Sequence, residues 1–167
     1  MSDTVTIRAA RADETHLILQ FVRELARYER LEDQVIATAA GLRTALFGPR
    51  PYAEVAFVCL HGEPVGFALF FHNFSTFRGR PGIYLEDLFV RPECRGRGLG
   101  RRLLTWLAAL AVDRGCARLE WAVLDWNEPS IGFYRSLGAV AMDEWTVFRL
   151  TGAPLEALAR QVGPASA

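Results

Sequence analysis

Residues 85–104 read LEDLFVRPECRGRGLGRRLL, a stretch that joins an apolar run, a polar loop and a helical pattern. The apolar run at 83–90 predicts a strand, and the apolar spacing after residue 99 predicts an amphipathic helix that reaches residue 114. Between them, Gly96, Gly98 and Gly100 permit a tight turn and a close approach of the backbone to a ligand. Unpaired amide N–H groups at a helix N-terminus favour a phosphate. The stretch therefore predicts a pyrophosphate site held mainly by backbone; the alternative is a loop that is only structural.

The patterns on either side of this stretch give the order β-α-α-β-β-β-α-β-α-β(β). Strands are predicted at 5–9, 54–60, 64–71, 83–90, 118–123 and within 140–150; helices are predicted after a cap at Asp13, from Thr38 to Leu46, and at 99–114, 129–137 and 154–161. This order predicts an α/β (α+β) protein with a mixed sheet and helices on both faces. We expect one domain over residues 1–167, with a core at about 4–150 and a short terminal helix at 154–161.

The composition excludes several classes of protein. All 19 basic residues are arginine, so this chain alone offers no lysine for a Schiff base, for pyridoxal phosphate or for a Walker-type phosphate loop. The net charge is zero, which disfavours nucleic acid and anionic membranes as partners. The 3 cysteines show no C-x-x-C spacing and the 3 histidines are scattered, so no metal site is predicted. The sequence shows no secretion signal or membrane span, and we expect a cytoplasmic protein.

A family resemblance extends this interpretation. Arg95-x-x-Gly98-x-Gly100 matches the R/Q-x-x-G-x-G/A acyl-CoA motif of the GNAT acetyltransferases. With LARYERLEDQV at 25–35, YLEDLFV at 84–90 and WNEPSIGFYRSLGA at 126–139, the chain resembles the diamine (spermidine/spermine) and thialysine acetyltransferase group over most of residues 4–150. The resemblance implies a mostly antiparallel sheet of six to seven strands, with a β-bulge opening at the acyl-CoA site. It also implies acetyl transfer from acetyl-CoA to a primary amine, and a homodimer.

The resemblance assigns catalytic roles that fit the chemistry. Aminolysis of a thioester requires removal of a proton from the amine and donation of a proton to the departing thiolate. Tyr134 takes the family's position of the general acid, and Glu86 relays the amine proton, with Asp87 as a supporting acid. Consecutive residues of a strand alternate sides, so Glu86 and Asp87 are expected on opposite faces of the sheet. Two structural carboxylates paired with arginines are the alternative.

The resemblance also assigns two sets of binding residues. The acetyl-CoA set comprises backbone or side-chain groups of Leu88, Phe89, Val90, Arg95, Gly96, Arg97, Gly98, Leu99, Gly100, Arg101, Asn127, Pro129 and Ser130. The amine set comprises Tyr28, Glu29, Glu86, Asp87, Glu120, Trp121 and Ala122. For Asn127 and Ser130 the alternative is helix capping.

The identity of the amine stays open between a polyamine, a lysine-like amine such as thialysine, and a peptide amine. The loop before the YLED residues reads NFSTFRGRPG, whose arginines lower the negative field expected around a polyamine and favour a lysine-like amine. A sensor that binds acetyl-CoA without catalysis is a rival function. By resemblance, Trp145, Val147 and Phe148 form a strand that is exchanged or interfacial in a dimer; an ordinary core strand is the alternative.

Overall fold

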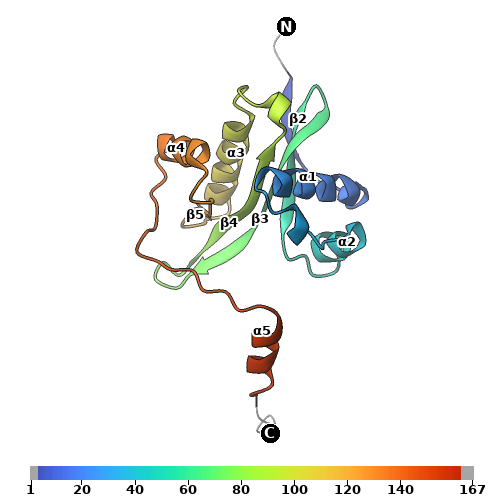
Figure 1. The fold of residues 1–167 in the computed structure, drawn as a ribbon. Helices are drawn as coiled ribbons and strands as arrows, with labels where there is room; N and C mark the ends of the chain where they lie inside the picture. Colours follow the sequence, from blue (N-terminus) through green and yellow to red (C-terminus); the bar gives the residue numbers. More distant parts are fainter. Residues whose placement is uncertain (1–3, 163–167) are drawn as a thin grey trace. The chain divides into compact units, whose positions relative to one another are not determined.

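The computed structural model describes residues 4–162, which divide into two compact units at the Ala122–Val123 boundary. The first unit contains a sheet in the order β1-β2-β3-β4-β5, in which every neighbouring pair is antiparallel except β4 and β5. The strands are β1 (Val5–Ala9), β2 (Glu54–Leu60), β3 (Glu63–Ser75), β4 (Arg80–Val90) and β5 (Leu119–Trp121) (Figure 1). The predicted mixed, mostly antiparallel sheet is confirmed.

The number of strands was predicted wrongly. The described residues form 5 strands, and residues 139–151 contain a turn near Asp143 and Glu144 but no strand. The alternating apolar residues of this stretch suit a strand, yet a strand forms only where a neighbour supplies hydrogen bonds. Val147 and Phe148 are 87% and 91% exposed, so the stretch has no such neighbour within the described part of the chain.

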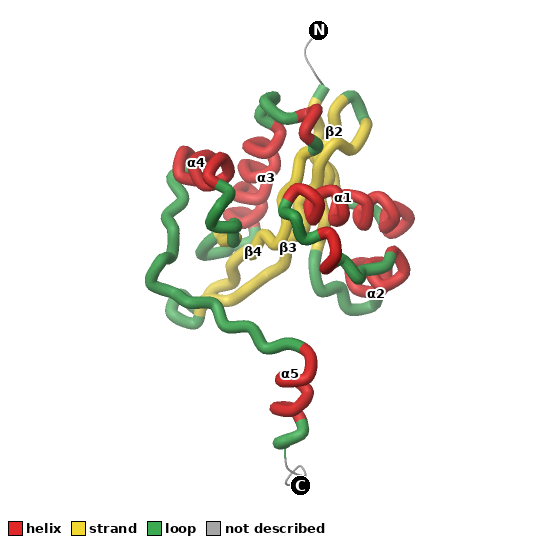
Figure 2. The backbone as a smooth tube through the Cα atoms, viewed as in Figure 1, coloured by secondary structure: helices red, strands yellow, loops and turns green. Residues whose placement is uncertain are grey.

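The helices match most of the predicted ranges (Figure 2). The first unit holds α1 (Thr15–Tyr28), α2 (Ala39–Phe47) and α3 (Leu99–Asp113), and the second holds α4 (Glu128–Ser136) and α5 (Gly152–Ala159). Thr38 caps α2 as predicted, because its hydroxyl accepts a hydrogen bond from the Gly41 amide at 3.1 Å. The predicted loop at 73–82 is shorter, since β3 and β4 continue to a tight hairpin at 75–80.

Helices cover both faces of the sheet in the first unit, as predicted: α1 and α2 lie on one face and α3 on the other (Figure 1). On the α1 face, Phe21 packs with its ring centroid 5.5 Å from Phe67, beside Phe57 and Phe89. On the α3 face, Phe70 meets Trp106 edge-on at 5.9 Å. The phenylalanines of the central strands are buried, and they fix the register of these strands because a slip of one residue would turn them to the wrong face.

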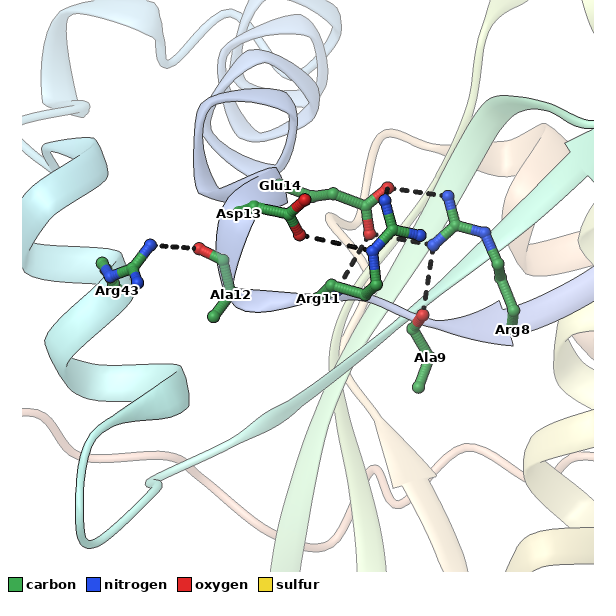
Figure 3. Close-up of polar contacts among 7 residues, drawn as sticks. All are labelled: Arg8, Ala9, Arg11, Ala12, Asp13, Glu14 and Arg43. Carbon is green, nitrogen blue, oxygen red and sulfur yellow. Dashed lines mark hydrogen bonds and ion pairs between the residues drawn. The ribbon is translucent and has the colours of Figure 1, made fainter.

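The predicted Asp13 cap of α1 was wrong, and ion pairs of Glu14 stabilise the start of this helix instead. A short 3-10 turn (Ala12–Glu14) precedes α1, and Glu14 instead takes the cap position. The Glu14 carboxylate accepts two hydrogen bonds from Arg8, at 2.8 and 2.7 Å, and one from the Arg11 amide at 2.9 Å (Figure 3). The Arg8 bonds, followed by the Arg11 amide and the two positive charges, lower the pKa of Glu14 to about 2 despite burial.

Candidate active site

A β-bulge in β4 determines which acid faces which side of the sheet. Across β3 and β4, Leu69 pairs with Asp87 while Phe70 pairs with Leu85, so β3 leaves Glu86 without an opposing residue. Strict alternation is therefore interrupted at Glu86. Asp87 shares the α1 face with its partner Leu69, which packs against the α1 core. The bulge places Leu85 and Asp87 on opposite faces of the sheet, and the expected placement of Glu86 opposite Asp87 stays a prediction.

Glu86 and Glu29 each lie near Asp87, and none of these three carboxylates forms an ion pair with a cationic side chain among residues 4–162. Burial first, and then the negative charges of Glu86 and Glu29, raise the pKa of Asp87 to about 7. Burial also raises the pKa of Glu29, the residue that caps the C-terminus of α1. No hydrogen bond or ion pair between Asp87 and a donor is present in residues 4–162. Such a group is costly unless a cation joins it, so this arrangement suits an ammonium ion.

Glu120 has a different environment, although it was predicted in the same amine set. On β5 it pairs in register with Tyr84, accepts a hydrogen bond from the Asn73 amide at 2.7 Å and forms an ion pair with Arg118 at 2.8 Å. Its negative charge is therefore already compensated. Asn73 and Arg118 were not predicted: Asn73 reaches Glu120 from another strand, β3, and Arg118 stands two residues before Glu120, just ahead of β5.

The outer edge of β4 can receive an extended ligand. β5 pairs with β4 only over Ile83–Leu85, so Leu88, Phe89 and Val90 have β3 on one side and no strand on the other among the described residues. Backbone amides and carbonyls on such an edge suit the two amides of a pantetheine arm. The predicted opening between these strands agrees with this short pairing.

The glycine loop has the conformation that an anion site requires. Gly96 and Gly98 have φ values of 75° and 72°, which side chains with a Cβ adopt only at a cost. Nothing lies within 4 Å of a Cβ built on either residue, so the space beside the backbone is open. Gly98 is the N-cap of α3, and the first turn carries Arg101 but no acid. Leu99 and Gly100 complete this turn, and the residues fit the phosphates of an acyl-CoA.

Arg95, predicted as a phosphate-site residue, has other partners. Its guanidinium carbon lies 4.6 Å from the centre of the Tyr28 ring and 5.5 Å from that of Phe89. Its Nε donates to the Val90 carbonyl at 2.9 Å. Sequence reasoning missed these contacts because Tyr28 and Arg95 lie far apart in the chain.

The second unit carries the other predicted residues on α4. Asn127 is buried and caps α4, since its side chain accepts a hydrogen bond from the Ser130 amide at 3.4 Å, and Pro129 stands in the first turn. Tyr134 follows one turn later, with its ring centroid 5.5 Å from that of Phe133. Helix capping, the alternative for Asn127, is thus observed.

No group of three or more histidine, cysteine or acidic side chains is placed to hold a metal ion among residues 4–162. None of the helices described there combines the length and hydropathy needed to cross a membrane.

Comparison with known proteins identifies the family. The model of the Acetyltransferase (GNAT) family matches residues 16–139. The thialysine N-epsilon-acetyltransferase of Bos taurus is 40% identical over 93% of this chain and 97% of its own length. The L-ornithine N5-acetyltransferase of Arabidopsis thaliana is 32% identical, over 91% of this chain and 86% of its own. A solved integron cassette protein of V. cholerae has a TM-score of 0.79 and 27% identity, covering 94% of this chain and 98% of that one.

The chain belongs to the GNAT acetyltransferase family. The resemblance to the diamine and thialysine acetyltransferase group, predicted from three sequence segments, is confirmed.

Proposed function

We propose that this protein transfers the acetyl group of acetyl-CoA to the primary amine of a lysine-like small molecule, within a ternary complex. The observation that carries the proposal is the uncompensated acidic group of Asp87 and Glu29 beside the unpaired edge of β4. The edge and the glycine loop fit acetyl-CoA, and the acids fit an ammonium group. The relatives that act on thialysine and ornithine support a small amine.

The reaction assigns a role to each group. An ammonium ion held by Asp87 loses a proton, which Glu86 passes to solvent because the Glu86 side chain is exposed at the bulge. The free amine attacks the thioester carbon, the N–C bond forms, and the C–S bond breaks as the tetrahedral intermediate collapses. The family resemblance assigns to the Tyr134 hydroxyl the proton that the departing thiolate takes, and the proton that the nitrogen loses as it becomes an amide restores that hydroxyl.

The charges near Glu120 favour a lysine-like amine over a polyamine. Arg118 already neutralises Glu120, and Arg78 and Arg80 occupy the hairpin between β3 and β4. A second ammonium group would therefore find a weaker negative field there, while the carboxylate of an amino acid would find a cation. A polyamine is the second candidate, supported by the resemblance to spermidine/spermine acetyltransferases.

We infer a single catalytic domain and a homodimer. The family match runs from 16 to 139, across the boundary between the two compact units, which supports one domain. Trp145, Val147 and Phe148 are exposed apolar residues in an extended stretch, as expected of a strand that pairs with a second copy. The 3 unpaired cysteines agree with a cytoplasmic location. Sedimentation of the purified protein measures the dimer directly, and a monomer at micromolar concentration would contradict it.

The deciding experiment measures thiol release from acetyl-CoA with thialysine, lysine, ornithine, putrescine, spermidine, spermine and a lysine peptide. We expect the highest kcat/KM with an amino acid that carries a side-chain amine. The Tyr134→Phe variant should lower kcat with little change in acetyl-CoA affinity. Binding of acetyl-CoA without turnover on any amine would support the sensor function instead.

A matched variant tests the acetyl-CoA site. Gly98→Val places a branched side chain at a φ of 72° and fills the open space beside the loop. We expect weaker binding of CoA, measured by calorimetry. Gly62→Val is the control, because Gly62 also has a positive φ of 89° but lies in the β2–β3 turn. Normal CoA affinity in Gly98→Val would refute the assignment of the loop.

A further inference from the structure

Two arginines of the segment between β4 and α3 contact the same face of α1. Arg91 forms two hydrogen bonds with the Glu24 carboxylate, at 3.0 and 3.1 Å, and its guanidinium carbon lies 4.8 Å from the centre of the Phe21 ring. Arg95 lies 4.6 Å from the centre of the Tyr28 ring. Their α1 partners occur at i, i+3 and i+7, so they share one side of the helix.

The contacts of Arg95 differ in kind from those of Arg91. Arg91 is paired with a carboxylate, whereas Arg95 forms no ion pair with an acidic side chain in residues 4–162. Arg95 instead stacks against Tyr28 and donates one hydrogen bond to the Val90 carbonyl. A planar guanidinium that stacks and donates at once holds a fixed orientation, which a lysine ammonium cannot reproduce.

The contact between Arg95 and Tyr28 links two parts of the candidate site. Arg95 directly precedes Gly96, the first glycine of the loop, and Val90 ends β4. Tyr28 directly precedes Glu29, one of the uncompensated acids. One side chain thus joins the start of the phosphate loop to the helix end that borders the amine site.

We propose that Arg95 is a positioning residue that fixes the glycine loop to Tyr28, and that this role outweighs any direct pairing of its charge with phosphate. The proposal rests on the proposed function for the identity of the ligand, acetyl-CoA. It adds that the shape of the loop depends on a residue of α1 that never meets the phosphates.

Two substitutions of Arg95 separate orientation from charge. Arg95→Lys keeps the positive charge and loses the stacked plane and the Nε donor. Arg95→Gln loses the charge but keeps an amide N–H that can donate to the Val90 carbonyl. If Arg95 binds phosphate directly, CoA affinity should be kept in Arg95→Lys and lost in Arg95→Gln. If Arg95 positions the loop, Arg95→Lys should reduce CoA affinity at least as much as Arg95→Gln.

The experiment measures the Kd of CoA by calorimetry, so it requires no turnover. We expect Arg95→Lys to weaken CoA binding about tenfold, the size of a desolvated cation–π contact. Tyr28→Leu should weaken it equally, and the double variant Arg95→Lys/Tyr28→Leu should be no weaker than either single variant. Arg91→Lys is the matched control, and we expect a lower Tm with a Kd within about twofold of the wild type.

Three results would overturn the proposal: wild-type affinity in Arg95→Lys with a loss in Arg95→Gln, additive losses in the double variant, or no CoA binding by the wild-type protein. The amine panel decides the proposed function separately. A protein that binds CoA and acetylates none of the amines still gives a result for Arg95.

Discussion

The two ends of α1 both carry a glutamate, and the structure treats the two glutamates in opposite ways. At the start of α1, Glu14 accepts hydrogen bonds from Arg8 and from the Arg11 amide, and its pKa falls to about 2. At the end of α1, Glu29 lies near Asp87, and the pKa of each of these carboxyl groups is raised by burial. Glu14 is thus a carboxylate that stabilises the fold through a cation of the same chain. Glu29 and Asp87 are carboxylates that a cationic ligand would neutralise.

The largest expected effect is the loss of activity in Asp87→Asn. An amide keeps the size of the side chain but cannot hold an ammonium ion or share its proton. We expect kcat/KM to fall by about 10² to 10⁴, the range for removal of an acid–base group. Steady-state thiol release measures this, with Glu14→Gln as the control that should keep kcat/KM. Equal losses in both variants would mean that the two ends of α1 do not differ in function.

The second prediction concerns the stability of the same two variants as pH changes. The folded-state pKa of Asp87 is raised to about 7, so ionisation of Asp87 destabilises the fold increasingly from about pH 4 to pH 7. We expect Asp87→Asn to be about 2 kcal/mol more stable than the wild type at pH 8, after allowance for partial exposure, and unchanged near pH 4. Urea unfolding at the two pH values tests this. A destabilised variant at pH 8 would show that Asp87 has an unrecognised partner.

Glu14 should show the opposite sign. Its folded-state pKa is depressed to about 2, so its stabilisation is present above about pH 5 and disappears as pH falls towards 2. The carboxylate is mostly buried, with 12% of its side chain exposed, while its partner Arg8 is 33% exposed. We expect Glu14→Gln to cost about 2 kcal/mol at pH 7 and nothing near pH 2. A cost that does not depend on pH would contradict the role given to its charge.

A smaller effect is expected from Glu29→Gln. The Glu29 charge is the third contribution to the raised pKa of Asp87, after burial and Glu86. Its removal should lower the pKa of Asp87 and move the acidic limb of the pH–kcat/KM profile to lower pH. An unchanged pH–kcat/KM profile would mean that Glu29 does not influence the ionisation of Asp87. Glu32→Gln is the control, because Glu32 is paired with Arg27 beyond the end of α1.

The smallest effect should come from Arg11→Ala. The Arg11 side chain is 62% exposed, and this exposed guanidinium forms ion pairs with Asp13 at 3.3 Å and with Glu14 at 3.4 Å. Such pairs contribute about 0.5 kcal/mol or less, and the Arg11 backbone amide that binds Glu14 remains. A loss as large as that of Glu14→Gln in urea unfolding would mean that the side chain, rather than the amide, supports Glu14.

Much of the fold and part of the site could be predicted from local sequence. The switch from helical to alternating periodicity near residue 54 placed β2 and β3, and the glycines before residue 99 placed the start of α3. The family resemblance implies a bulge at the acyl-CoA site, but its position at Glu86 could not be predicted from local sequence, because the register of β3 and β4 depends on how their aromatic faces pack. The stack of Arg95 on Tyr28 joins residues far apart in the chain, and no local pattern encodes it. Residues 140–150 were mistaken for strands because alternation alone does not supply a partner.

The bulge gives Glu86 the role of a spacer that is independent of its charge. A chain with the same acids but without this one extra residue would regain strict alternation in β4, and its aspartate would lie beneath α3 instead of facing α1. Replacing Glu86 by glutamine changes a charge, whereas deleting it reverses the side of the sheet on which the next carboxylate stands. In this strand, the number of residues between Leu85 and Asp87 therefore determines the face of the sheet on which the Asp87 carboxylate lies, whatever residue stands at position 86.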